Sequence, residues 1–330
     1  MKIVILYSLP TRRALKTTYL ATDEDTQESA EKVHDALLSK NQEAFLQPIT
    51  EDTIDRIGVV SADCIMNLIE WSGLDLPLNF KAVEALVATG IPFTGADLPN
   101  LQITSDKVRM KQALDIAHLP NSRWQQFATG QERIREDFSY PVIVKLALEH
   151  CSIGLSHDAV VFDPKGLRLL VGERIKTFGQ PVLAEEFITG GEFQVTVLDR
   201  SGGLAVLPPA EILFIDKGVA GFLTYESRWD SSHIDYNQSS IDIAHLDSHL
   251  SKKIETIARD TFTRLKFCDY ARLDIRVRDE NVFILEANSN PGLDDDDEYG
   301  MTVSYKAVGM TFADFVWEIV VSCLRRFKNS

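Results

Sequence analysis

The segment ARLDIRVRDENVFILEANSNPG, residues 271–292, has the pattern of a β-hairpin with charge on one face. In its first half, apolar and charged residues alternate with the two-residue period of a strand. Asp279-Glu280-Asn281 predicts a turn, and VFILEAN predicts the returning strand. SNPG then ends that strand in a second turn, so we expect oxygen-bearing side chains at the strand end.

The length of the first turn decides which side chains face one another across this hairpin. If residues 279–281 form a three-residue loop, Asp274 lies opposite Glu286. Arg272 then lies opposite Asn288 on the same face of the sheet. This register predicts two carboxylates, one amide and one guanidinium in a single cluster.

Two facing carboxylates predict a bound cation. Like charges directly opposite one another destabilise a sheet, unless a cation lies between them or one group is protonated. The oxygens of Asp274, Glu286 and Asn288 are hard donors, which favour Mg²⁺ over Zn²⁺. The alternative is an ordinary hairpin with a solvated charged face, and the motifs in the rest of the chain favour the metal.

The composition of the whole chain limits its function. Its 330 residues are 45% hydrophobic and 25% charged, which predicts a folded protein of two or three domains. Acids outnumber bases by 49 to 34, and the net charge of −15 argues against binding to nucleic acid or anionic membranes. No uncharged apolar stretch approaches about 18 residues. The four cysteines are too scattered for a disulfide framework, so we expect a cytoplasmic protein.

The order of elements predicts an α/β domain over 1–100, a small α+β lobe over 101–190 and a larger α+β lobe over 191–330. In the first range we expect a strand at 2–7, a polar loop over 10–28, a helix at 29–40, a strand at 63–69 and a helix at 79–89. The later ranges predict strands at 141–145, 160–162, 182–188, 193–198 and 204–208, and helices at 105–117, 165–176, 246–265 and 311–326. The first domain is therefore expected to be doubly wound.

Six segments in this order resemble motifs of the D-alanine–D-alanine ligase branch of the ATP-grasp superfamily. They are TSDK at 104–107, YPVIVK at 140–145, EHCSIG at 149–154, AEEFITGGEF at 184–193, TYESRW at 224–229 and the hairpin with its Pro291-Gly292. Each motif alone is weak evidence, but six in sequence over most of the chain are strong. The resemblance implies an ATP-grasp fold with a separate N-terminal α/β domain.

The resemblance also implies a chemistry. A carboxylate substrate attacks the γ-phosphate of ATP to form an acylphosphate, and an amine displaces phosphate to form an amide. ATP is the expected cofactor, with two Mg²⁺ ions for which Mn²⁺ can substitute. The expected partners are small-molecule carboxylates and amines, with a homodimer as the implied assembly.

The resemblance assigns roles to individual residues. Those implied to contact ATP are Lys107 and Lys145 at the α- and β-phosphates, Glu185 at the adenine amino group, Phe187 or Ile188 at the ring edge, Glu192 at the ribose, and Arg228 at the transferring phosphate. The implied metal ligands are Asp274, Glu286 and Asn288. Arg272 is implied to stabilise the acylphosphate and the tetrahedral oxyanion, and Ser152 joins Arg272 and Arg228 among the expected catalytic residues. His150 and Cys151 are interpreted as spacers, not as a nucleophile pair.

The departures from the family lie where it recognises its amino acids. Cys151 and Trp229 replace a serine and a tyrosine, and EHCSIG at 149–154, which resembles the family's phosphate loop, has one glycine where the family has two. The family's N-terminal GGxSxE, whose glutamate binds the first substrate's ammonium group, is replaced by SLPTRRALKTTYLATDEDT at 8–26. Asp23, Glu24 or Asp25 could supply that anion.

An acidic run follows the second turn. Beyond Gly292 the family has small residues and a serine, but this chain has DDDDE at 294–298. Acids here, with Asp296 and Asp297 as candidates, would repel a carboxylate and attract an amine-rich acceptor. The alternative is a solvated acidic loop.

The leading hypothesis is therefore an ATP-dependent carboxylate–amine ligase whose substrates are not two D-alanines. A true D-alanine–D-alanine ligase with a divergent pocket is an alternative within the same class. From other classes, an ATP-grasp small-molecule kinase and a catalytically silent ATP-binding regulator stay open. The facing carboxylates argue against the silent regulator, because an inactive protein has no physical need for them.

Overall fold

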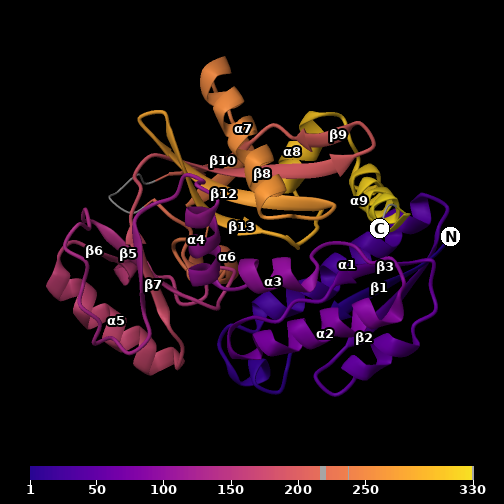
Figure 1. Ribbon diagram of the computed structural model, residues 1–330, viewed down its shortest axis with the longest axis horizontal. Coiled ribbons are helices and arrows are strands. Elements are labelled where there is room, and N and C mark those ends of the chain that lie inside the picture. Colours follow the sequence, from indigo (N-terminus) through magenta and orange to yellow (C-terminus); the bar gives the residue numbers. More distant parts are fainter. Residues whose placement is uncertain (216–220, 237, 329–330) are drawn as a thin grey trace.

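The computed structural model describes residues 1–215, 221–236 and 238–328, which form three β-sheets joined by helices (Figure 1). In Figure 1 the N-terminal sheet lies at the right, the small middle sheet at the left, and the largest sheet above and between them. Among the described residues, no single helix is long and apolar enough to cross a membrane. Helices α8 (Gly300–Ala307) and α9 (Phe312–Lys328) pass that test only as a bent pair, by length and composition.

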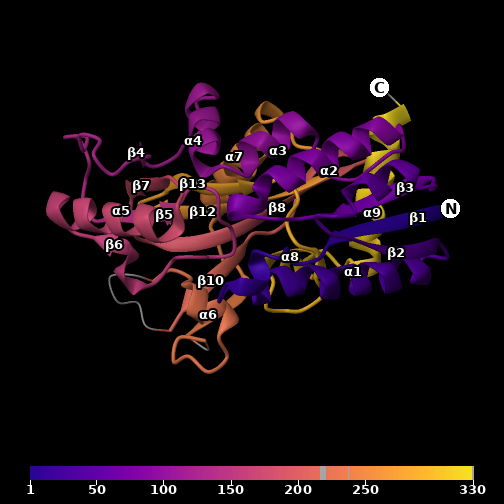
Figure 2. The same cartoon turned by 90° about the horizontal axis from the view of Figure 1, so that it is seen from below.

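The N-terminal sheet is parallel, in the order β2-β1-β3. Its strands are β1 (Lys2–Ser8), β2 (Glu43–Ile49) and β3 (Cys64–Leu68). Alternate residues of β1 point to opposite faces: Ile3 and Ile5 pack with helix α1 (Ala21–Ser39), and Val4 and Leu6 pack with helix α2 (Leu76–Thr89). Figure 2 shows α1 and α2 on opposite sides of β1, which confirms the doubly wound arrangement.

Two expectations for this region were wrong. Helix α1 begins at Ala21, so the second half of the predicted polar loop is helical. Strand β2 was not predicted, because EAFLQPI is an edge strand with no regular apolar alternation: its four middle residues, one of them a proline, are exposed or partly exposed.

The middle sheet is antiparallel, in the order β4-β7-β5-β6. Its strands are β4 (Trp124–Phe127), β5 (Val142–Leu146), β6 (Val160–Val161) and β7 (Val182–Glu186). Helix α5 (Pro164–Phe178) covers one face, and its Leu167 and Val171 pack against Val144 and Ala184. The helix begins where the Asp163 side chain caps it and ends at Gly179, which has a left-handed φ of 64°.

The largest sheet has the order β11-β10-β8-β12-β13, with β9 beside β8. Its strands are β8 (Gly191–Arg200), β9 (Gly203–Val206), β10 (Ala210–Phe214), β11 (Ser239–Ile243), β12 (Tyr270–Arg278) and β13 (Asn281–Asn288). The remaining helices are α3 (Leu98–Thr104), α4 (Lys107–Ile116), α6 (Tyr225–Trp229), α7 (Ser248–Arg264), α8 (Gly300–Ala307) and α9 (Phe312–Lys328). Short 3-10 helices span Ala14–Lys16, Ile54–Val59, Gly73–Asp75 and His157–Ala159.

The hairpin β12–β13 has the predicted pairing at its polar end but not at its turn. The turn has two residues, Asp279 and Glu280, both with left-handed φ values of 49° and 60°, so the predicted three-residue loop was wrong. Asp274 nevertheless pairs with Glu286, because the register shifts by one residue just beyond this pair, at Leu285. This bulge turns Glu286 to the face opposite the buried Ile284.

Two apolar cores cross the predicted domain boundaries. Phe315 and Ile319 of α9 pack with Ile3 and Ile5 of the N-terminal sheet. In the same way, Met110 and Leu114 of α4 pack under the largest sheet, against residues of α7, β12 and β13. The ends of the chain are therefore held together through packed side chains.

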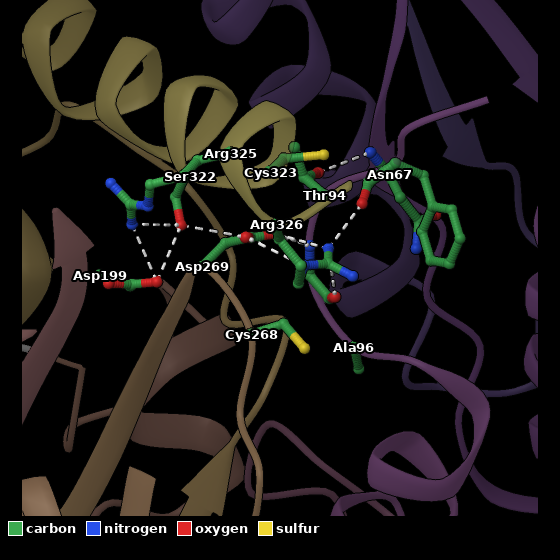
Figure 3. A network of polar contacts seen from close by, with 12 residues as sticks. Asn67, Thr94, Ala96, Asp199, Cys268, Asp269, Ser322, Cys323, Arg325 and Arg326 are labelled. Carbon is green, nitrogen blue, oxygen red and sulfur yellow. Dashed lines mark hydrogen bonds and ion pairs between the residues drawn. The ribbon is translucent and has the colours of Figure 1, made fainter. Parts of the chain in front are cut away.

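A polar network reinforces this contact (Figure 3). Asp269, which is fully buried before β12, pairs with Arg326 of α9 at 2.8 Å and accepts a hydrogen bond from the backbone N–H of Gly95. Arg326 also donates to the carbonyl of Phe93, and Arg325 pairs with Asp199 of β8. One helix thus ties the largest sheet to the segment that follows α2.

Candidate active site

A pocket lies between the three sheets and contains most of the predicted site residues. Its lining includes residues of strands β3, β5, β7, β8, β12 and β13, of helices α1 and α4, and of the segments at 149–155, 222–229 and 290–293. Every residue of the predicted ATP and metal sets lines it, as do Arg272, Cys151, Ser152, Trp229 and Gly292. Asp296 and Asp297 do not.

On the hairpin face, each carboxylate has a cation beside it. Arg272 donates to both oxygens of Asp274 at 2.8 and 3.0 Å, and the amide of Asn288 donates to Asp274 at 3.1 Å. Lys107 lies 2.7 Å from Glu286. These partners relieve the repulsion that facing carboxylates would otherwise suffer.

Glu286 has a second neighbour, the imidazole of His150, whose Nδ1 lies 3.2 Å from Oε1. Burial acts to raise the pKa of Glu286, but Lys107 and His150 outweigh it and hold the pKa well below its ordinary value. The carboxylate is therefore ionised at neutral pH. His150 is more than the spacer we expected, since its ring reaches the polar face of the hairpin.

The residues on this face fit a magnesium ion. Asp274, Glu286 and Asn288 offer two carboxylates and an amide oxygen at neighbouring strand positions. Within the described chain, no three His, Cys, Asp or Glu side chains form a closed metal cage. An open set of oxygen donors suits Mg²⁺, which keeps waters and binds nucleotide phosphates.

A buried charge cluster lies beside the hairpin. Glu185 of β7, which is 1% exposed, is 2.7 Å from Lys145 of β5 and 2.7 Å from Lys111 of α4. Ser122 donates to the same carboxylate at 2.6 Å. Burial acts to raise the pKa of Glu185, but the two lysines lower it to about 2. Two lysines and one glutamate leave a net positive charge toward the pocket.

A second arginine organises the neighbouring wall. Arg276 of β12 pairs with Glu192 at 2.6 Å and donates to the backbone carbonyl of Ile188 at 2.7 Å. Its guanidinium also lies 4.8 Å from the ring centre of Phe187. Arg276 therefore orients the side chains and backbone that were predicted to hold the adenine edge and the ribose.

The phosphate loop is closed from one side by a tryptophan. Cys151 and Ser152 both have left-handed φ values, 54° and 61°, so the loop turns sharply there. Trp229 of α6 donates from Nε1 to the carbonyl of Cys151 at 3.1 Å, and Arg228 lies over the Trp229 ring. Burial raises the pKa of the Cys151 thiol to about 12, so this sulfur is protonated at neutral pH.

The acidic run at 294–298 lies outside the pocket lining. Asp294 is buried and accepts hydrogen bonds from Lys32 of α1 at 2.9 and 2.8 Å. Asp296 and Asp297 are exposed, and Asp297 pairs with Lys306 at 2.7 Å. The run joins α1 and α8 to the second turn, so its geometry favours the solvated-loop alternative over contact with substrate.

Residues 112–321 match the family model described as the D-ala D-ala ligase C-terminus. The chain belongs to the D-alanine–D-alanine ligase family. Membership confirms the ATP-grasp fold and makes the protein an ATP-dependent, ADP-forming ligase of carbon–nitrogen bonds. It also confirms ATP as the nucleotide.

Curated relatives of this ligase match along most of their length. A D-alanine–D-alanine ligase of Alcanivorax borkumensis is 31% identical over 72% of this chain and 71% of its own. A D-alanine–D-alanine ligase of Neisseria meningitidis is 26% identical over 89% of this chain and 91% of its own length. An uncharacterised protein, y4sG of Sinorhizobium fredii, is 27% identical over 89% and 84%.

Solved structures share the fold of this ligase. The structure of a D-alanine–D-alanine ligase of Bacillus anthracis aligns over 100% of this chain and 99% of its own chain, at 19% identity and a TM-score of 0.76. The VanG D-Ala:D-Ser ligase of Enterococcus faecalis covers 98% with 100% of its own, at 16% identity and a TM-score of 0.73.

Three residues of the ligase pocket region were missed from the sequence, Lys111, Arg276 and Glu70, and His150 was interpreted only as a spacer. Lys111 follows Lys107 by one helical turn, and Arg276 follows Arg272 and Asp274 on one strand face, so their spacing could have indicated them. Glu70 carried no signal, because it lies just after β3 in a segment that matched no motif.

Proposed function

We propose that this ligase joins a carboxylate substrate to an amine and that its substrates are not two D-alanines. Lys107, Lys145 and Glu192 line the pocket where the resemblance assigns them to ATP. Around the phosphate loop, Cys151 and Trp229 stand where the family has serine and tyrosine, and they contact one another. This contrast between the two halves of the pocket carries the proposal.

In the first step, an oxygen of the carboxylate substrate attacks the γ-phosphorus of ATP. The bond from that phosphorus to the bridging oxygen breaks, which releases ADP and leaves an acylphosphate. Lys107, Lys145 and Arg228 would offset the charge on the phosphates, which is the main demand of phosphoryl transfer. Mg²⁺ held by Asp274, Glu286 and Asn288 would supply further charge neutralisation.

In the second step, the nitrogen of the amine attacks the acyl carbon. The carbon–oxygen bond to phosphate breaks, the nitrogen loses a proton, and the products are an amide and inorganic phosphate. Arg272 would stabilise the oxyanion that forms between these events, while its contact with Asp274 holds the guanidinium in place. Ser152 would contribute a hydroxyl at the same end of the pocket.

Among the three N-terminal acids considered for the ammonium group of the carboxylate substrate, we propose Asp25. It lines the pocket from the first turns of α1, and Tyr299 donates to it at 3.1 Å. Burial raises its pKa, so a cation at this position would be stabilising. The side chains of Asp23 and Glu24 lie outside the described part of the structure.

The proposal retains the other expectations that follow from the resemblance. They are a second Mg²⁺ ion, replacement of Mg²⁺ by Mn²⁺, a homodimer, a cytoplasmic location, and domains at 1–100, 101–190 and 191–330. Roles in substrate contact for Gly292, Cys151 and Trp229 belong to it as well, since all three line the pocket.

The test is Mg²⁺-dependent phosphate release from ATP with pooled amino acids and amines of both stereochemistries, followed by mass spectrometry. We expect amine-dependent release and a product lighter by one water than the sum of two inputs. Efficient condensation of D-alanine with itself, in preference to every other pair, would contradict the proposed substrates. Release of ADP that needs no amine would favour a kinase instead.

A further inference from the structure

A carboxylate that no predicted motif contains lies in the substrate half of the pocket. Glu70 follows the C-terminal end of β3 and lines the pocket with Asp25, Cys151 and Arg272. Its backbone is held on both sides: its N–H donates to Ser8 Oγ at 3.0 Å, and its carbonyl accepts from the same hydroxyl at 2.6 Å. These two hydrogen bonds fix the backbone of Glu70, whose side chain lines the pocket.

The Glu70 carboxylate has no hydrogen bond or ion pair with any residue in the described part of the chain. The charged groups that act most strongly on it are His150, Arg272, Asp25 and Glu286. Both basic groups are engaged elsewhere, since Arg272 holds Asp274 and His150 contacts Glu286. Burial is the largest influence on Glu70 and raises its pKa. An ionised carboxylate left in this position is costly unless a cation joins it.

A neighbouring side chain has a hydrogen-bond donor that no residue in the described part of the chain accepts from, although its oxygen accepts from the Ile69 N–H. Asn67, near the end of β3, is 1% exposed and lines the same pocket, and its Nδ2 has no hydrogen-bond acceptor. A buried amide donor without an acceptor points to an oxygen on a bound ligand. The two unpartnered groups together suit a ligand that carries both a positive charge and a carbonyl or carboxylate oxygen.

We propose that Glu70 binds a positively charged side chain of the substrate, which makes a basic amino acid the substrate class. This inference rests on the proposed function, in which Asp25 takes one ammonium group, so Glu70 takes a second charge. The nitrogen at Glu70 is not the one that reacts, because a protonated nitrogen in an ion pair has no free electron pair for attack. The charge at Glu70 therefore selects the substrate and takes no part in the bond that forms.

The test compares matched amino acids on the wild-type ligase and on Glu70→Gln. Lysine and ornithine, as both stereoisomers, are paired with their uncharged counterparts norleucine and norvaline, and kcat/KM is measured by ATP-dependent phosphate release with product masses. We expect the wild-type protein to favour the charged member of each pair roughly 30-fold or more, as for a buried charge pair. Glu70→Gln should abolish this preference by lowering kcat/KM for lysine and ornithine, while kcat/KM for norleucine and norvaline stays unchanged.

A binding measurement separates this inference from the proposed function. Calorimetric titration of lysine and norleucine, in the presence of ATP and Mg²⁺, reports on the Glu70 site without requiring turnover. Loss of lysine binding in Glu70→Gln supports the inference even if no product forms. Equal use or binding of both members of each pair by the wild-type protein overturns the inference, whereas absence of amine-dependent release overturns the proposed function.

Glu84→Gln on the exposed face of α2 is the matched control for charge removal. The melting temperature of Glu70→Gln should be no lower than that of the control and its ATP affinity equal, because the Glu70 side chain has no partner among the described residues and its charge is costly to bury. Asp25→Asn serves as the second variant. If it abolishes the preference for lysine while Glu70→Gln retains it, the charge is bound at Asp25 and the assignment to Glu70 is wrong.

Discussion

At the scale of single residues, the carboxylates of the reaction centre each lie beside a cation before a ligand binds. Glu286 lies beside Lys107, and Asp274 lies beside Arg272. Glu185 lies between two lysines. Glu70 differs, since it shares the pocket but has neither a hydrogen bond nor an ion pair within the described residues. Paired groups suit a preorganised reaction centre, and an unpaired group suits recognition.

Asp274→Asn and Glu286→Gln test the assignment of the metal site. We expect each variant to lower phosphate release by at least about 100-fold, because charge neutralisation at the phosphates is lost. Circular dichroism should show an intact fold, since both side chains line the pocket and not a core. A variant that keeps full activity at limiting Mg²⁺ would contradict the assignment of that residue as a metal ligand.

Lys111→Met tests the buried charge cluster. Lys111 is 0% exposed, and its removal would leave Glu185 with one of its two cations. We expect the free energy of unfolding to fall by about 3 kcal/mol, as for other broken buried ion pairs. Urea denaturation measures this loss, and Lys81→Met at an exposed position of α2 is the control. A loss no greater than that of the control would show that Lys111 adds nothing to stability.

Glu185 also makes a prediction about pH. Its pKa is about 2 in the folded protein against an ordinary value of 4.5, so its contribution to stability is complete above about pH 4.5 and is lost as the pH falls toward 2. The lost free energy of unfolding should be at most about 3 kcal/mol. Urea midpoints of the wild-type protein and of Glu185→Gln should therefore converge between pH 4.5 and 3. Parallel curves would contradict the lowered pKa.

At the scale of elements, the hairpin β12–β13 combines a tight turn with a bulge. The two-residue turn would place Glu286 on the buried face with Val282 and Ile284, because all three positions are even-numbered. The bulge at Leu285 restores Glu286 and Asn288 to the pocket face. The predicted three-residue loop and the observed turn with a bulge therefore bring the same pairs together by different routes.

The turn itself offers a stabilising substitution. Glu280 has a φ of 60°, which glycine adopts without steric cost and glutamate does not. Glu280→Gly should raise the free energy of unfolding by about 1 kcal/mol and leave activity unchanged, since the turn lies outside the pocket lining. The hydrogen bond from Lys253 reaches the Glu280 carbonyl and would survive. A lower melting temperature in the variant would argue against a strained turn.

At the scale of the whole molecule, the two ends of the chain share a core. Helix α9 packs on the N-terminal sheet, and Arg326 joins this contact to the buried Asp269 (Figure 3). The pocket is lined from all three sheets, so its shape depends on how they are held together. Contacts far from the pocket, such as this network, therefore help to position the residues that line it.

Arg326→Met and Arg325→Met form a matched pair on neighbouring positions of α9. Arg326 pairs with a carboxylate that is fully buried, so its removal should cost about 3 kcal/mol of unfolding free energy. Arg325 pairs with the half-exposed Asp199, and its removal should cost less than about 1 kcal/mol. Thermal denaturation compares the two variants, and equal losses would show that the burial of Asp269 is not decisive.

Much of the fold and the reaction centre could be predicted from sequence, because both depend on short-range patterns. Alternating residues in β12 and β13 place Arg272, Asp274, Glu286 and Asn288 on one face, and six ordered motifs indicate the family. The edge strand β2 and the start of α1 were missed, since neither has a strong apolar period.

Only the tertiary structure decided which charges meet across sequence distance. Lys111 and Glu185 lie far apart in the chain, and so do Lys32 and Asp294, yet each pair is in contact. No local pattern encodes such contacts, because they depend on how whole sheets pack. The same packing removed Asp296 and Asp297 from the pocket and brought Glu70 into it. The sequence by itself thus determined the chemistry of this ligase, and the packing of three sheets decided which side chains can recognise its substrates.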